Sequence, residues 1–229
     1  MKRSTALGHC ICDVKQPCPC DLFRQKDICH CAGEKVGSDG DEVKLTQHVR
    51  SAGCASKIAK NVLQEVLKGL PEIDDRRVLV GSSAGDDAGV MMLSPDTATV
   101  LTVDVFCPSV DDPYRFGQIA AANSLSDVYA MGAKPQAALS IIGFPVHVLP
   151  APAMHEILRG GLEKMKEAGV PVIGGHSIND EEVKCGFAVI GTTGKGRYIR
   201  NAGAKVGDAV LLPVRRTAAN ARIPRLYKR

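Results

Sequence analysis

Residues 102–135, TVDVFCPSVDDPYRFGQIAAANSLSDVYAMGAKP, decide the fold because they join an apolar strand to a long helix. The strand pattern begins slightly upstream, where ATVLTVDVF (98–106) is rich in Val and Leu. Residues 115–131 place small and apolar side chains on one side, which is typical of a helix. Each element also holds a carboxylate among apolar neighbours, Asp104 in the strand and Asp127 in the helix. A carboxylate in such a setting is costly unless it is paired or binds a metal ion.

Strands and helices alternate on both sides of this stretch. Residues 58–70 repeat aliphatic side chains at helical spacing, and residues 152–168 form an amphipathic helix that ends at Gly169. The other strand-like segments are 77–81, 88–93, 136–144, 171–175 and 183–194. This alternation predicts an α/β or α+β fold. Because the strands are apolar throughout, we expect helices to cover at least one face of the sheet.

The composition is that of a globular protein and excludes several classes. The chain has 229 residues, 45% hydrophobic and 24% charged, which allows one domain or one domain plus a fragment. No apolar run approaches the roughly 20 residues that span a bilayer, and the first 30 residues lack the apolar core of a signal peptide. We therefore expect a cytoplasmic protein that binds no membrane.

Four segments differ in composition. Residues 1–31 are rich in Cys, residues 32–44 read as a polar linker, residues 45–213 carry regular patterning, and residues 214–229 form a basic tail. The net charge of +4 depends on that tail, which holds six basic side chains and no acid. Without those six, 23 basic residues face 25 acidic ones, so we expect no nucleic-acid binding.

A second pair of acids extends the pattern of Asp104 and Asp127. Asp86 and Asp87 lie in GSSAGDDAGV (81–90), between two expected strands. Together these sites suggest a shared Mg²⁺ cluster of the kind that carries nucleotide phosphates. A simple turn is the alternative for the 81–90 acids, and a salt bridge to Lys or Arg is the alternative for the other two. No Walker A sequence is present, so an ATP site here would not be a P-loop.

Two further segments hold groups that could act on a ligand. In SAGCASK (51–57), Cys54 and Lys57 stand where we expect a helix to start, and both features favour a nucleophilic thiol. A buried Cys beside a solvated Lys is the alternative. In GGHSIND (174–180), two glycines permit close backbone approach to a ligand, and His176 is expected in the loop beyond the strand. A Gly-rich turn with an exposed His is the alternative there.

At this point the residues match a family, because residues 45–212 resemble selenophosphate synthetase (selenide, water dikinase). The matching stretches include AGCASKI (52–58), VGSSAGDDAGV (80–90), the long 102–135 stretch and GGHSINDEEVKCGFAVIGT (174–192). The resemblance implies a PurM-like ATP-binding fold, a mixed sheet covered by helices that forms a homodimer through its sheet. It also implies that ATP, selenide and water are converted with Mg²⁺ into selenophosphate, AMP and phosphate, for selenocysteine and selenouridine formation.

The resemblance assigns roles by position. It implies that Cys54 and Lys57 are the catalytic pair, with Lys57 also contacting ATP phosphates, and it places Ser56 where many members have a second Cys. The implied Mg²⁺ ligands are Asp87, Asp104 and Asp127. The other implied ATP-binding residues are Ala84, Gly85, Asp86, Asp104, Asp127, Gly174, Gly175 and His176. The last three would act in part across the dimer.

The two ends of the chain depart from that family. The family continues beyond GDAVLL (207–212) into a second domain, so we expect its C-terminal domain to be absent here and activity to be impaired. At the front, the spacing of Cys18, Cys20, Cys29 and Cys31 resembles the catalytic subunit of ferredoxin–thioredoxin reductase. These thiols could hold an iron–sulfur cluster or zinc, or belong to a disordered tail.

Two other functions stay open on the sequence alone. One is a different PurM-like kinase, such as one acting on thiamine monophosphate. The other is a non-catalytic remnant that binds a nucleotide or a metal ion.

Overall fold

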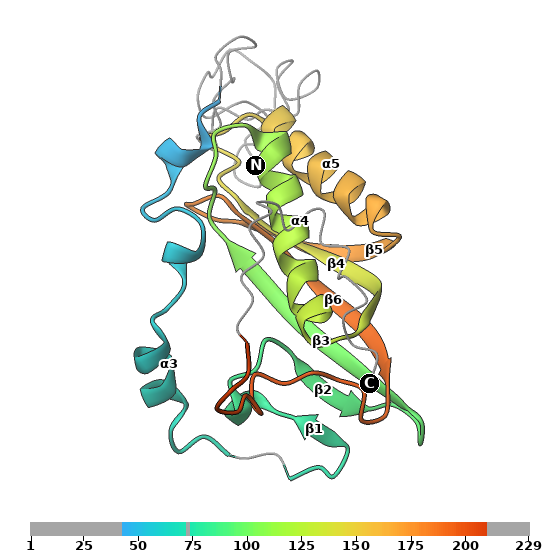
Figure 1. Ribbon diagram of the computed structural model, residues 1–229. Coiled ribbons are helices and arrows are strands. Elements are labelled where there is room, and N and C mark those ends of the chain that lie inside the picture. Colours follow the sequence, from blue (N-terminus) through green and yellow to red (C-terminus); the bar gives the residue numbers. More distant parts are fainter. Residues whose placement is uncertain (1–42, 72–73, 210–229) are drawn as a thin grey trace, which may run out of the picture.

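The computed structural model describes residues 43–71 and 74–209 of the chain. The Cys-rich segment with Cys18, Cys20, Cys29 and Cys31, nearly all of the expected linker and the basic tail lie outside the described residues. The described chain forms one mixed sheet with two long helices packed on it (Figure 1). This arrangement confirms the α/β class predicted from the alternating pattern.

The strands are β1 (Val78–Val80), β2 (Gly89–Met92), β3 (Thr97–Phe106), β4 (Lys134–Phe144), β5 (Val172–Asn179) and β6 (Lys184–Gly194). The α-helices are α3 (Lys60–Leu67), α4 (Pro113–Ala130) and α5 (Ala151–Glu167). Short 3₁₀ turns are η2 (Leu45–His48), η3 (Cys54–Ser56) and η4 (Ser82–Ala84). Every strand and helix that the sequence predicted within the described residues is present, with shifted ends.

The strands lie in the order β1-β2-β3-β6-β4-β5, so neighbours in the sheet are often distant in sequence. All neighbouring pairs are antiparallel except β4 and β5, which are parallel. The central ladder joins β3 to β6 over the whole length of β3, from Thr97 opposite Gly194 to Phe106 opposite Cys185. Strand β3 is therefore held on both sides, by β2 and by β6.

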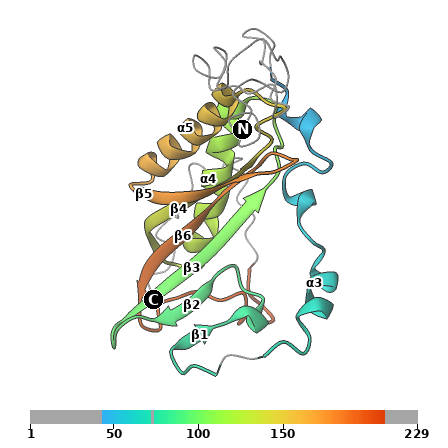
Figure 2. The ribbon, with the colours of Figure 1, turned by 180° about the vertical axis from the view of Figure 1, so that it is seen from behind.

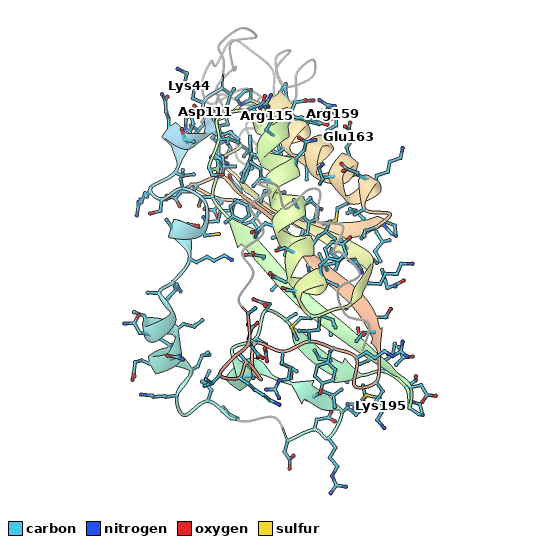
Figure 3. All side chains as sticks on the ribbon, in the orientation of Figure 1. Lys44, Asp111, Arg115, Arg159, Glu163 and Lys195 are labelled. Carbon is cyan, nitrogen blue, oxygen red and sulfur yellow. The ribbon has the colours of Figure 1, made fainter. Side chains whose placement is uncertain are left out.

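Helix α4 begins where its sequence provides a cap. The Asp112 carboxylate accepts a hydrogen bond from the Arg115 backbone N–H at 2.8 Å, and Pro113 occupies the first helical turn. At the same end, Arg159 of α5 lies 4.2 Å from the centre of the Tyr114 ring and pairs with Glu163 (Figure 3). The Arg159–Tyr114 contact joins the two helices at this end.

Glycines let α4 and α5 approach each other closely. A Cβ on Gly117 of α4 would overlap the Ile157 carbonyl oxygen of α5, and a Cβ on Gly160 of α5 would overlap the Tyr114 carbonyl oxygen of α4. Because neither glycine has a side chain, backbone can pack on backbone where the helices cross. The two helices therefore form one closely packed layer over the sheet.

The core lies between this helical layer and the sheet. Its largest fully buried side chains include Phe116 of α4, Phe144 of β4 and Phe187 of β6. Ser124 of α4 is also fully buried, and its hydroxyl accepts a hydrogen bond from the Phe187 N–H at 3.1 Å. The same hydroxyl lies 3.1 Å from the Asp104 carbonyl oxygen of β3, so α4 is joined to both central strands.

The opposite face of the sheet is covered by none of the described helices. Figure 2, viewed from behind, shows β3, β6 and β4 in front of α4 and α5. Apolar side chains stand exposed on this face, and they are Leu101, Val103, Leu139, Ile173 and Ile190. The prediction that helices cover at least one face of the sheet is thus confirmed. The other face is apolar and stays uncovered in the described part of the chain.

Helix α3, which the helical spacing of residues 58–70 predicted, lies apart from the sheet (Figure 1). Its apolar side Val62, Leu63, Val66 and Leu67 is exposed in the described structure. None of the described helices is both long enough and apolar enough to cross a membrane.

We expect Gly117→Ala to lower the free energy of unfolding by about 1–3 kcal/mol, the usual range for overpacking. The added methyl group must push α5 away from α4, and this cost outweighs the better helix propensity of Ala. Urea denaturation followed by circular dichroism measures the change. Gly89→Ala is the control because its Cβ would meet its nearest heavy atom at 3.7 Å. Equal stability of the two variants would contradict this account of the helix packing.

Candidate functional site

Asp104 is the centre of a polar cluster between β3, α4 and the segment before α3. Strand alternation puts its side chain on the helix-covered face, where the residue is 7% exposed. Lys57 Nζ lies 2.6 Å from Asp104 Oδ1, and Asn123 Nδ2 donates a hydrogen bond to Asp104 Oδ2. The salt bridge considered as an alternative from the sequence is therefore present. Its partner is the Lys57 that the resemblance had singled out.

Asp127 lies one helical turn after Asn123 on α4. Its Oδ2 accepts a hydrogen bond at 2.8 Å from Thr102 Oγ1, two residues before Asp104 on the same strand face. Burial raises the pKa of Asp127, and the charges of Asp104 and Asp87 raise it further, against the Thr102 hydrogen bond and the Lys57 charge. The charges of the other two sequence-predicted metal ligands, Asp87 and Asp104, thus act on Asp127.

Lys57 carries a positive charge that offsets the negative charge of the neighbouring carboxylates. Partial burial pushes its pKa down, but the hydrogen bond to Asp104 and the charges of Asp104, Cys54 and Asp127 outweigh burial. The pKa of Lys57 therefore ends above its ordinary value, and the side chain stays an ammonium group. Its side chain is 46% exposed, so it can also meet a ligand from solvent.

Cys54 and Lys57 are held near β3 by the turn η3. Gly53 adopts φ 56°, a left-handed conformation that suits glycine, and its N–H donates to the Cys107 carbonyl at 3.0 Å. Ser56 Oγ donates to the Gly53 carbonyl at 2.7 Å and closes the turn. The expected helix start at Lys57 is wrong, because a three-residue 3₁₀ turn comes first and α3 begins at Lys60.

The loop from Ala84 to Asp87 contributes unequally to this cluster. Gly85 is left-handed at φ 66°, which suits the tight entry into β2. The Asp86 carboxylate accepts a hydrogen bond from the Asn201 N–H at 2.5 Å and pairs with Arg200 at 3.4 Å. Asp86 therefore holds the segment after β6 in place. Asp87 is exposed, and its negative charge helps to raise the pKa of Asp127.

Gly174, Gly175 and His176 lie elsewhere, in β5 at the edge of the sheet. The expectation that His176 follows the strand in a loop is wrong, because β5 runs on to Asn179. Three strand spacings, roughly 14 Å, separate β5 from β3. A Cβ on Gly175 would overlap Ser140 of β4, so packing alone already requires that glycine. The chain does not bring these residues to the Asp104 cluster.

Sequence reasoning missed Thr102 and Cys107. Thr102 could have been found, because a period of two from Asp104 puts both side chains on one strand face. Cys107 gave no such signal, since its contact with Gly53 joins residues that are far apart in sequence. Within residues 43–71 and 74–209, no three His, Cys, Asp or Glu side chains are grouped closely enough to form a preformed metal site.

Comparison with known proteins places this geometry in context. Residues 85–194 match the family described as AIR synthase related protein, N-terminal domain. The selenide, water dikinase of Carboxydothermus hydrogenoformans is 51% identical over 172 residues, which are 75% of this chain and 50% of that protein. The Myxococcus xanthus selenide, water dikinase is 50% identical over 173 residues, 75% of this chain and 49% of that protein. The chain thus spans about half the length of these relatives.

The fold is also similar to a solved structure described as AaThiL complexed with AMPPCP and TMP. The TM-score is 0.51 with 23% sequence identity, covering 65% of this chain and 44% of that one. At this identity the likeness concerns the fold alone, and it agrees with the sheet and helices described above. Residues 85–194 therefore match the AIR synthase related N-terminal domain, within a segment that is similar in sequence to selenide, water dikinases.

Proposed function

We propose that this protein takes part in ATP-dependent synthesis of selenophosphate from selenide and water, with release of AMP and phosphate. The observation that carries the proposal is the Lys57–Asp104 pair beside Asp127. It joins an ammonium group, a nearby thiol and carboxylates in a chain similar to selenide, water dikinases. Phosphorus NMR of the protein with Mg²⁺, ATP and selenide tests the proposal. Phosphorylation of thiamine monophosphate instead would favour the other kinase.

The donor set fits Mg²⁺ that arrives with a nucleotide. Asp87, Asp104 and Asp127 offer oxygen ligands, which Mg²⁺ prefers, but Asp104 is already satisfied by Lys57 and Asn123. Mg²⁺ is usually held by one or two carboxylates together with substrate phosphates, so a preformed cluster of three is not required. When bound, the ion would offset phosphate charge and polarise the phosphoryl group that is transferred.

The protein's own residues then have separate tasks. The Lys57 ammonium group, half exposed beside Asp104, donates to a phosphate oxygen and holds it near the carboxylates. Asn123 fixes the Asp104 carboxylate, and Thr102 fixes that of Asp127. Cys54 is exposed next to Lys57, where it can receive the selenium substrate. The left-handed Gly53 sets the direction from which Cys54 and Lys57 approach.

A homodimer would complete the site. The open sheet face carries Leu101, Val103, Leu139, Ile173 and Ile190, and burial of such side chains is favourable by about 25 cal/mol per Å² of apolar surface. We propose that two copies pack these faces together. The β5 residues Gly174, Gly175 and His176 would then contribute to nucleotide binding across the dimer, as the resemblance implies.

We also propose how the chain is divided and where the protein acts. We propose that residues 1–31 form a separate thiol-rich segment that holds an iron–sulfur cluster or zinc, followed by a linker over 32–44. We propose that residues 45–213 are the nucleotide-binding unit and that the protein acts in the cytoplasm. We propose, as the second candidate, a non-catalytic role in binding a nucleotide or a metal ion.

We expect Lys57→Ala to weaken Mg-ATP binding at least tenfold and to abolish selenide-dependent turnover. Removing the ammonium group deletes a phosphate donor and leaves the buried Asp104 carboxylate with Asn123 alone. Isothermal titration calorimetry and phosphorus NMR measure the two effects. Lys68→Ala is the matched control, because Lys68 pairs with Glu65 on the exposed surface of the same segment. Unchanged Mg-ATP affinity in Lys57→Ala would remove Lys57 from the site.

We expect Asp127→Asn to raise stability at neutral pH while weakening Mg-ATP binding. Because burial and two like charges raise the folded-state pKa of Asp127, its ionised form destabilises the fold above that pKa, and protonation on acidification relieves the cost. The amide keeps the Thr102 hydrogen bond without the charge. Urea denaturation at neutral and acidic pH should show a stability gain that shrinks as pH falls. A loss of stability at neutral pH would contradict this charge assignment.

We expect Leu139→Glu to convert a dimer into a monomer while the helix content stays unchanged. Leu139 is 45% exposed on the open sheet face, so the substitution should change the stability of the monomer little. In the dimer, the same charge would be buried in an apolar interface, which is costly. Sedimentation analysis measures the mass. Leu162→Glu on α5 is the control, since Leu162 is also 45% exposed but lies on the helical layer. A monomeric wild-type chain at micromolar concentration would rule out this interface.

A further inference from the structure

A second thiol lies directly beside the Cys54 turn. Gly53 and Cys107 form an isolated antiparallel bridge, in which the Gly53 N–H donates to the Cys107 carbonyl at 3.0 Å. The Ser56 hydroxyl lies 3.5 Å from the Cys107 N–H. The three-residue turn that begins at Cys54 is thus folded over Cys107, although 53 positions separate the two cysteines in the sequence.

The bridge sets how far apart the two thiols can lie. Partners across an antiparallel bridge have Cα atoms about 4.5–5.5 Å apart. Cys54 is one residue, or about 3.8 Å, along the chain from Gly53. The Cα atoms of Cys54 and Cys107 therefore lie no more than about 9 Å apart, a limit that includes the range of about 4.4–6.8 Å that disulfides span. Disulfide formation then requires the short η3 turn to bring the Cys54 sulfur against that of Cys107.

The two cysteines differ in exposure and in surroundings. Cys54 is exposed, whereas Cys107 is 2% exposed. Burial raises the pKa of the Cys107 thiol, and the charge of Glu182 adds to this against the Ser56 hydrogen bond. Cys107 is therefore a protonated thiol that solvent oxidants do not reach. Its Sγ lies 4.0 Å from Glu182 Oε2, a carboxylate held by the Arg50 N–H at 3.0 Å.

We propose that Cys54 and Cys107 form a reversible disulfide when a hydroperoxide oxidises Cys54. The Cys54 thiolate attacks a peroxide oxygen: an S–O bond forms, the O–O bond breaks and hydroxide leaves, so that sulfur loses the two electrons that the peroxide gains. The Cys107 sulfur then attacks the Cys54 sulfur. An S–S bond forms, the S–O bond breaks, and the departing hydroxide leaves as water. Glu182 accepts the Cys107 proton and passes it to the departing hydroxide, which becomes that water.

This thiol pair is independent of the proposed function, because it requires only the turn η3 and the end of β3. Its effect is protective: a sulfenic acid that meets a thiol immediately becomes a disulfide instead of advancing to the irreversible sulfinic acid. While the disulfide lasts, Cys54 is held against the protein and removed from solvent. A dithiol reductant restores both thiols by exchange.

The test is peptide mapping of the full chain. Reduced protein is treated with a small excess of hydrogen peroxide, free thiols are blocked with N-ethylmaleimide, and tryptic peptides are analysed by mass spectrometry. Cleavage after Arg50, Lys57, Arg77 and Arg115 places Cys54 in peptide 51–57 and Cys107 in peptide 78–115. We expect these two peptides to be linked, and dithiothreitol to separate them.

Three variants decide the mechanism. Cys107→Ala should remove the linked peptide and raise sulfinic Cys54 severalfold. Cys185→Ala, which removes an equally buried thiol of β6, should keep the link. Glu182→Gln should slow the appearance of the link without slowing the loss of the Cys54 thiol. The proposal fails if Cys54 becomes linked to Cys185 or to an N-terminal cysteine, or if wild-type Cys54 is over-oxidised without any link.

Discussion

A single buried carboxylate organises this structure. Asp104 lies in an apolar strand, where an unpaired charge would cost several kcal/mol. Two contacts offset this cost: an ion pair with Lys57, which precedes α3, and a hydrogen bond from Asn123 of α4. The first contact holds a segment that otherwise has few attachments to the sheet, and it brings Cys54 along. The same electrostatic requirement that stabilises β3 therefore places the thiol and the ammonium group together.

The shape of the helical layer follows from glycine. Gly117 and Gly160 let α4 and α5 lie backbone to backbone, and Ser124 joins α4 to β3 and β6. All of this packing is on one face of the sheet. The exposed aliphatic side chains of the other face alternate along the strands with residues that are buried in the core. A one-sided sheet of this kind keeps its second face available, which is why assembly and nucleotide binding are linked in the proposed function.

Much of this fold could be predicted from local patterns. The strands and the helices α4 and α5 follow from period-two and period-3.6 spacing, and Asp104 and Asp127 stood out because each lies among apolar residues. What the sequence could not predict depends on pairings between distant segments. The Gly53–Cys107 bridge and the Asp86–Asn201 hydrogen bond leave no trace in periodicity. The position of His176 was misjudged because GGHSIND contains residues typical of turns, whereas parallel pairing with β4 extends β5 through them.

The order of the strands also shapes how the chain can fold. The longest ladder pairs β3 with β6, from Thr97 opposite Gly194 to Phe106 opposite Cys185, while α4, β4, α5 and β5 all lie between them in sequence. Closing such a long loop costs conformational entropy before the hydrogen bonds of the ladder can offset it. Folds with many contacts between distant segments therefore form slowly. On the ribosome, β3 must wait for β6 to emerge before its second edge is covered. A newly made chain therefore exposes an apolar strand edge during synthesis, a period in which association with other chains competes with correct folding.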